Sequence, residues 1–334
     1  MTTGYVNQTH RAAAPAPAAA TAAAPLGAVR RTLRFVAVAA TLPYLTLKAA
    51  WLSGSRIGIP DGSMLLEPGV FFTVANAATL LMDALLVVIV LALTRPWGRR
   101  IPSWLMAVPV FTATGLLTPI VFGFPGVTLI RMLGGGPDAA QAAAAEPFLD
   151  PWVYNVVYTG FSLQALALIG LFVPYARERW GRLWQGSAGA PMSGRIRAVA
   201  AAGAAGALAF TGVQLYWTAG GTAGLSAEQI AHWSSDSVVM AVVNALCALS
   251  GAAGGLLLAR GGRRNVRGPL ALAWVGGSAA AGWGAWLSIA ALGPSDDPAK
   301  DPAALLHLAY AGQMITGLLV ATVLTRFFTT RRTG

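Results

Sequence analysis

The chain has few charged residues and only one cysteine. Asp, Glu, Lys and Arg make up 10% of its 334 residues, whereas 56% are hydrophobic. A soluble domain carries about 25% charged residues, so this composition excludes an ordinary water-soluble fold. The one cysteine, Cys247, excludes an intramolecular disulfide and any metal or cluster site built from several cysteines.

Motifs of common catalytic sites are also missing. The sequence contains no Walker loop, no HExxH zinc pair, no GxSxG elbow and no glycine-rich dinucleotide turn. We therefore expect no metal site and no use of bound nucleotide by this chain, and the sequence indicates no particular cofactor.

Long apolar runs dominate what is present. Each run is close to the roughly 20 residues that cross about 30 Å of hydrocarbon as a helix. The sequence predicts an all-α polytopic membrane protein with eight transmembrane helices, near 35–53, 70–93, 103–124, 152–175, 197–219, 237–259, 269–292 and 303–327.

Charge alternates from one connection to the next. The connections on one side hold three cations (Arg56, Arg131 and Lys300) and ten acidic residues, and those on the other side hold groups of arginines. These groups are Arg30, Arg31 and Arg34, then Arg95, Arg99 and Arg100, then Arg177, Arg179, Arg182, Arg195 and Arg197, then Arg260, Arg263, Arg264 and Arg267, and finally Arg326, Arg331 and Arg332. Because arginine is retained in the cytoplasm during insertion, we expect a cell-membrane protein with both termini cytoplasmic.

The formal net charge is +11, a value that also occurs in nucleic-acid-binding proteins. Here the arginines lie at predicted membrane edges, so topology and anionic headgroups explain them and nucleic acid is not expected as a partner. The expected partner is the lipid bilayer. Residues 1–29, which are rich in Ala and Pro over 11–25, are predicted to be a disordered cytoplasmic tail.

Two segments of the chain align with each other as four-helix units, 30–183 and 195–334. Tyr44, Lys48, Trp51 and Gly54 align without a gap on Phe210, Gln214, Trp217 and Gly220, and Asn76 aligns on Asn244. Asp150-Pro151 and Tyr158-x-Gly160 match Asp301-Pro302 and Tyr310-x-Gly312. Two units of four helices would have the same orientation in the membrane, as parallel repeats. The alternative is that alanine-rich helices align by chance.

One part of the second unit resembles a known group. The segment from Leu215-Tyr216-Trp217 through Gly220-Gly221 and Gly224 is similar to actinobacterial four-helix membrane proteins of unknown function, and the Ala/Gly/Arg-rich composition fits that origin. The resemblance implies duplication of a small membrane unit and implies no activity.

Ionisable residues inside the spans are the first candidates for a functional site, because a charge in hydrocarbon costs roughly 2.5–3.5 kcal/mol. Lys48 lies in the outer part of the first span and Asp83 near the middle of the second, on the same helical face as Asn76 and Thr79. We expect Lys48 and Asp83 to form a pair bridged by Asn76. The alternative is that Lys48 extends to the interface and only anchors its helix.

The second unit keeps polar residues at the equivalent positions, Gln214 and Asn244, but has Gly251 in place of the carboxylate. Charge in one copy only favours a site of chemistry or ion coupling over a structural layer. The last span adds His307, Tyr310 and Gln313 at near-helical spacing, and the fourth span adds Tyr158. His307 either moves protons or is hydrogen-bonded packing.

Three functions stay open. The first is transport or flipping of a small molecule or lipid, through a cavity open to the outside between the two units and lined by Lys48, Asp83 and His307. The second is a membrane-embedded enzyme or enzyme subunit acting on a lipid or modified peptide. The third is a non-catalytic scaffold or immunity protein. A membrane or cytoplasmic protein partner and a homodimer through small-residue faces, such as those of Gly203, Gly206 and Gly276-Gly277, are also open.

Overall fold

The computed structural model describes residues 27–66, 69–137, 148–292 and 303–333. Almost all of the predicted tail, 1–26, lies outside these ranges, as does Asp301-Pro302 of the proposed alignment. The described part is almost entirely helical and contains eight helices of 24 or more residues. They are α1 (Ala28–Leu52), α2 (Val70–Thr94), α3 (Ser103–Met132), α5 (Pro151–Trp180), α6 (Gly194–Thr218), α8 (Ser235–Arg260), α9 (Arg267–Ala290) and α10 (Ala304–Thr333).

The remaining elements are short. They are three 3-10 helices, η1 (Met64–Leu66), η2 (Pro96–Arg100) and η3 (Gly181–Trp184), the one-turn helix α7 (Ala227–Ala231), and two strands, β1 (Ser187–Gly189) and β2 (Gly262–Asn265). β1 and β2 pair antiparallel and join the connections that precede α6 and α9. No connection in the described part forms a separate soluble domain.

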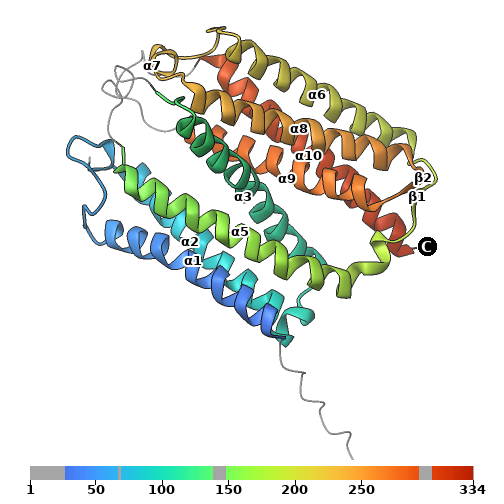
Figure 1. The fold of residues 1–334 in the computed structure, drawn as a ribbon. Coiled ribbons are helices and arrows are strands. Elements are labelled where there is room, and N and C mark those ends of the chain that lie inside the picture. Colours follow the sequence, from blue (N-terminus) through green and yellow to red (C-terminus); the bar gives the residue numbers. More distant parts are fainter. Residues whose placement is uncertain (1–26, 67–68, 138–147, 293–302, 334) are drawn as a thin grey trace, which may run out of the picture.

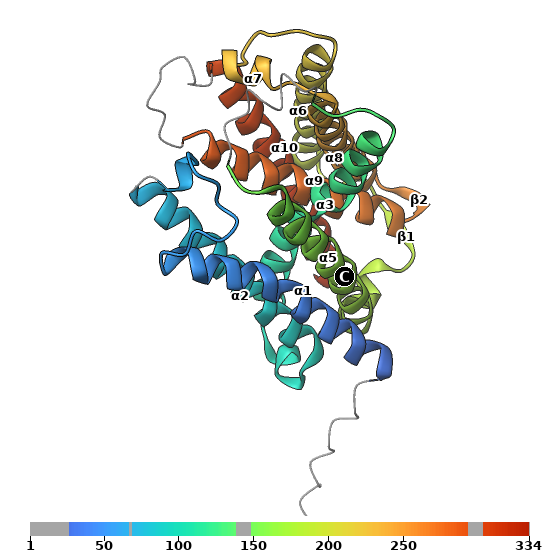
Figure 2. The ribbon, with the colours of Figure 1, turned by 60° about the vertical axis from the view of Figure 1, so that its left-hand side comes forward.

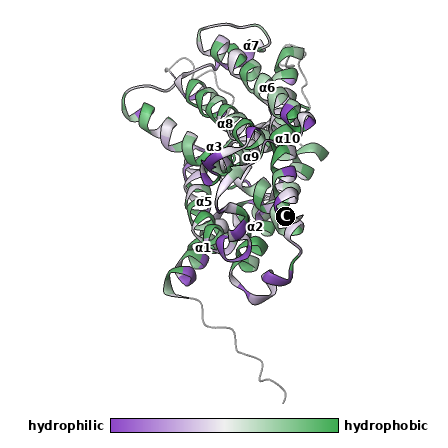
Figure 3. Ribbon diagram, turned by 90° about the vertical axis from the view of Figure 1, so that its right-hand side faces the viewer, coloured by the Kyte–Doolittle hydropathy of each residue, from purple (hydrophilic) through white to green (hydrophobic). Residues whose placement is uncertain are grey.

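Seven of the long helices are long and apolar enough to cross a membrane, and α9 is not among them. The chain is therefore a multi-pass membrane protein of the all-α class. α9 carries only one charged residue, Arg267. Its mean hydropathy is low because Gly, Ser and Trp are frequent in it. Figure 3 shows the long helices coloured mainly as hydrophobic.

The helices alternate in direction, so the arginine-rich connections gather at one end of the bundle, which we call the basic end. There α1, α3, α6 and α9 begin and α2, α5, α8 and α10 end. Glu178 joins three elements at this end, since it accepts from Arg30 at 2.6 Å and from Arg99 at 2.8 Å. Both pairs are partly exposed and contribute little stability on their own. At the opposite end Arg131 pairs with Asp236.

The predicted second unit forms a compact bundle in which α6, α8, α9 and α10 pack against one another. Glycines set the close approach of these helices. A Cβ at Gly251 would lie 2.6 Å from Gly276 C, and one at Gly317 would lie 2.6 Å from Ala281 Cα. Gly203, Gly206, Gly276 and Gly277 therefore face neighbours within the chain, and a homodimer, which stays a prediction, would need another surface.

The predicted first unit is not compact. α1 packs on α2 and α5, but α3 has few contacts with α2 and lies mainly against α9 and α8 of the second bundle. Figures 1 and 2 show α1 and α2 on one side, the second bundle on the other, and α3 and α5 between them. Gly115 allows the crossing of α3 and α9, because a Cβ there would lie 2.6 Å from Ser278 C. α3 thus separates from α2 and lies between two parts of the molecule. We call these the first half, which contains α1, α2 and α5, and the second half, which contains α6, α8, α9 and α10.

The ends of α1 and α6 have the same local structure. The indole Nε1 of Trp51 donates to the carbonyl oxygen of Ile57 at 2.8 Å, and that of Trp217 donates to Ala223 at 2.9 Å, in each case six residues further on. The glycines three residues after the tryptophans, Gly54 and Gly220, have φ of 92° and 91°. Positive φ favours glycine, so the matching residues occupy matching conformations.

Candidate functional site

Lys48 lies at the centre of the polar residues of the first half. Its side chain is 7% exposed, and its ammonium donates to Asn76 Oδ1 at 2.6 Å, from α1 to α2. The ammonium also lies 4.9 Å from the ring centroid of Tyr44 and 5.1 Å from that of Trp51. Cation–π contacts of this kind stabilise a desolvated charge by up to about 2 kcal/mol. Lys48 is therefore held inside the helix packing by contacts with Asn76, Tyr44 and Trp51.

Asp83 is buried one to two turns nearer the basic end on α2. It is 4% exposed, and its Oδ2 has no hydrogen-bond partner within the described ranges. Asp83 interacts electrostatically with Lys48, but no ion pair within 4.0 Å joins the two. The predicted hydrogen bond between Lys48 and Asn76 is thus present. Neither residue forms a hydrogen bond or an ion pair with Asp83, so the predicted pair of Lys48 and Asp83 is not bridged through Asn76. A buried carboxylate oxygen without a donor is costly, which makes Asp83 a candidate for function.

Tyr158 of α5 borders this group of residues, which we call the Lys48 cluster: Tyr44, Lys48, Asn76, Asp83 and Tyr158. The Tyr158 ring lies 5.6 Å from the Phe124 ring of α3, and Tyr44 packs on α5 through the Phe161 ring at 5.1 Å. The cluster therefore joins α1, α2 and α5 and reaches the edge of α3.

The candidates of the second half form a separate set. Gln313 Nε2 donates to Asn244 Oδ1 at 3.1 Å, from α10 to α8, and Asn244 Nδ2 donates to the Met240 carbonyl at 2.9 Å. Gln214 is buried on α6, and Tyr310 packs against the apolar core of this half. His307 is partly exposed, and within the described ranges no hydrogen bond of its imidazole is recorded. The two polar sets lie in different halves of the molecule and do not line one cavity.

A cavity of about 600 Å³ lies where α3 separates from α2. Side chains of α2, α3, α5 and α9 line it, together with Leu183 and Trp184 of η3 and Phe328 of α10. It begins at the basic end, at Ser103, Arg177 and Arg267, and reaches Ala165 and Phe122 near the middle of α5 and α3. None of the nine polar candidates from the sequence lines it, and it lies toward the basic end instead of the outer side.

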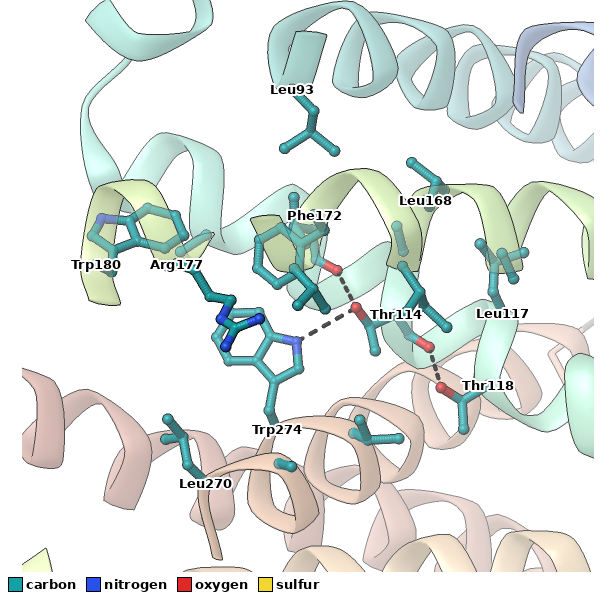
Figure 4. Close-up of a pocket in the computed structure, with 18 of the residues that line it drawn as sticks. Leu93, Thr114, Leu117, Thr118, Leu168, Phe172, Arg177, Trp180, Leu270 and Trp274 are labelled. Carbon is teal, nitrogen blue, oxygen red and sulfur yellow. Dashed lines mark hydrogen bonds between the residues drawn. The ribbon is translucent and has the colours of Figure 1, made fainter. Parts of the chain in front are cut away.

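The cavity wall is almost wholly apolar. Trp274 of α9 lies at its centre, with its ring stacked on Phe172 at 6.0 Å and its indole N–H 3.4 Å from Thr114 Oγ1 (Figure 4). Thr114 and Thr118 donate their hydroxyl protons to backbone carbonyls one turn earlier in α3, so they offer little unused polarity. Such a wall suits hydrocarbon and not a hydrated ion.

This cavity could not be predicted from the sequence, because most of its lining residues belong to ordinary apolar runs. A second buried contact was also missed: Gln164 Nε2 on α5 donates to Thr41 Oγ1 on α1 at 2.7 Å. Here a signal existed, since an amide in the middle of an apolar run needs a partner inside the protein.

Comparison of the chain with protein-family models, curated proteins and solved structures finds no match. The resemblance to actinobacterial four-helix proteins therefore stays a prediction.

Proposed function

We propose that this protein transports or flips an amphipathic molecule, a lipid or a small molecule with an apolar body, through the space between its two halves. The observation that carries the proposal is the cavity of about 600 Å³ between α2, α3, α5 and α9. Pockets that hold organic ligands have volumes of about 300–1,000 Å³ and mainly apolar walls. A cavity at the junction of two helix bundles is also where rocking of one bundle against the other changes access.

Eight transmembrane helices, with α9 as the seventh, fit this function. α9 has 24 residues and packs between α8, α10 and α3, so most of its small residues face helices and do not need to be as apolar as residues that face lipid. With eight spans both termini lie on one side of the cell membrane, and the arginines place the basic end in the cytoplasm. The cavity then opens on the cytoplasmic half.

An origin by duplication also belongs to this proposal. The support is the common structure around Trp51 and Trp217, where hydrogen bonds and glycine φ values agree at aligned positions. If the two units are repeats, α3 corresponds to α9. Packing of α3 on α9 then places the repeats in contact along an axis through the cavity region.

In this proposal the Lys48 cluster is a polar binding site that the transported molecule meets in addition to the apolar cavity. Lys48 lies toward the end of the bundle opposite the cavity and Asp83 lies near the middle of α2, where a headgroup or a coupling ion crossing the membrane would meet them. This assigns Lys48 and Asp83 to the path and leaves Asn244 and Gln313 as structural contacts.

The experiment is lipid and solute movement in vesicles that contain the purified protein. Fluorescently labelled phospholipids of defined headgroup report flipping when an impermeant reductant bleaches the outer leaflet. Ala107→Phe fills the cavity, and the matched control Val108→Phe adds similar bulk to an exposed neighbour on the same helix that does not line it. We expect Ala107→Phe to slow movement at least tenfold and Val108→Phe to leave it unchanged. Equal rates in protein-free vesicles would contradict the proposal.

A further inference from the structure

We infer that the cavity binds an anionic phospholipid, with its headgroup at Arg177 and Arg267 and an acyl chain between α3, α5 and α9. The inference names the ligand class of the proposed function. It rests on that function only where it concerns movement of the bound lipid across the membrane. Binding itself can be measured on its own.

Both charged side chains that line the cavity in the described structure are arginines. Arg177 lies in the last turn of α5, and Arg267 is the first residue of α9. In Figure 4 the Arg177 side chain extends from α5 toward Trp274 of α9. No carboxylate is among the lining residues. The mouth of the cavity therefore presents two positive charges and favours an anion.

These two guanidinium groups differ from several other arginines of the chain. Arg30 and Arg99 bind Glu178, Arg179 donates to the Gly98 carbonyl, and Arg331 donates to the Leu183 carbonyl. Within the described residues, neither the Arg177 nor the Arg267 side chain forms a hydrogen bond or an ion pair, and both residues are exposed. Their donors are free for a ligand. A planar guanidinium matches a phosphate through two parallel hydrogen bonds.

The length of the cavity fits one leaflet. From Arg177 to Ala165 along α5 the lining extends for 12 residues, which is about 18 Å at about 1.5 Å per residue. Half of the hydrocarbon core is about 15 Å thick. A headgroup at the two arginines thus places an acyl chain beside Trp274, Leu168 and Leu117.

Access from the side distinguishes a lipid from a soluble anion. Phe122 and Ile169, which line the cavity, are 62% and 54% exposed, so the wall continues onto the apolar outer surface of α3 and α5. That surface would face hydrocarbon. Trp180 and Trp184 lie at the mouth, at the depth where indole rings prefer to meet headgroups.

The test is native mass spectrometry of the full chain, exchanged from detergent into equal mixtures of phosphatidylglycerol and phosphatidylcholine. We expect bound phosphatidylglycerol in excess on the wild type. Loss of one charge-assisted contact weakens binding by about tenfold. The double variant Arg177→Gln and Arg267→Gln should therefore bind phosphatidylglycerol about a hundredfold more weakly.

The matched control removes the same charge from the same end of the molecule. Arg263→Gln with Arg264→Gln changes two exposed arginines of β2 that do not line the cavity, and it should retain the lipid. Arg177→Lys with Arg267→Lys keeps the charges and should retain part of the preference, which separates binding from folding. Equal loss in the β2 control, or equal binding of the two lipids by the wild type, would overturn the inference. Displacement of the lipid by millimolar inorganic phosphate alone would also overturn it.

Failure of this inference and failure of the proposed function give different results. Flipping that is equally fast for both headgroups and insensitive to the two arginines leaves transport standing and removes the headgroup site. Arginine-dependent binding without any flipping leaves the site standing and removes transport.

Discussion

Lys48 on α1 donates a hydrogen bond to Asn76 on α2, with 2.6 Å between Nζ and Oδ1. The contact is a polar link between the two helices, and the ring centroids of Tyr44 and Trp51 lie 4.9 Å and 5.1 Å from the ammonium. The side chain that the proposed function assigns to the path therefore also holds α1 against α2.

The first prediction concerns this pair. Asn76→Leu removes the partner of a buried charge and should destabilise the protein by about 3 kcal/mol. Adding Lys48→Met removes the charge as well and should recover most of the loss, because a matched apolar pair needs no hydrogen bond. Thermal unfolding in mild detergent, followed by size-exclusion chromatography, measures both variants. If the two effects simply add, Lys48 and Asn76 are not coupled.

The second prediction separates the polar contact of the other half from the site. Gln313 is fully buried and donates to Asn244, so Gln313→Leu should cost about 0.6 kcal/mol, the average for hydrogen bonds between membrane helices, and at most about 1.7 kcal/mol. Because we assign this contact to structure, the folded variant should bind and move lipid like the wild type. A large loss of lipid movement with unchanged stability would place Gln313 in the path.

The third prediction tests the equivalence of the two helix ends. Trp51→Phe and Trp217→Phe each remove one indole donor from a carbonyl six residues further on, and each should cost about 1 kcal/mol. Thermal unfolding of the two single variants and the double variant measures this. Similar losses that add in the double variant are expected, since the ends lie in different halves. A cost confined to one tryptophan would argue that the common geometry has no common role.

Much of the helical architecture could be predicted from composition and spacing. The apolar runs match the long helices, because membrane spanning demands a fixed length of apolar sequence. The contact of Lys48 with Asn76 was also accessible, since a buried ammonium needs a partner and only few polar side chains lie at its depth. Whether these residues act in function stays a prediction.

The path of α3 could not be predicted. Sequence alignment assigns α3 to the first unit, whereas it packs mainly on α9 and α8 of the second. The close approach depends on Gly115, one of 39 glycines, and nothing in the sequence distinguishes it from the others. The cavity follows from this displacement, so it was equally hidden, and the sequence instead led to an outward cavity lined by Lys48, Asp83 and His307.

The fourth prediction therefore concerns Gly115. A methyl group there would meet the backbone of Ser278, which cannot yield, so Gly115→Ala should destabilise the protein by about 1–3 kcal/mol. Gly212 on α6 has nothing within 4 Å of a built Cβ, and Gly212→Ala should be neutral or stabilising by about 0.5–1 kcal/mol. Thermal unfolding compares the two. Equal effects would mean that α3 and α9 are not in close contact.

The fifth prediction decides whether α9 crosses the membrane. The one native thiol, Cys247, is buried, and Cys247→Ala gives a background without cysteine. Arg264→Cys lies before α9 and Leu292→Cys after it, and both positions are exposed. If the basic end is cytoplasmic, as proposed, an impermeant maleimide should label Leu292→Cys in intact cells and should label Arg264→Cys only after the membrane is opened. Labelling of both cysteine variants from the same side would mean that α9 does not cross the membrane. The chain would then have seven spans with its termini on opposite sides, and the α9 wall of the cavity would not span the bilayer.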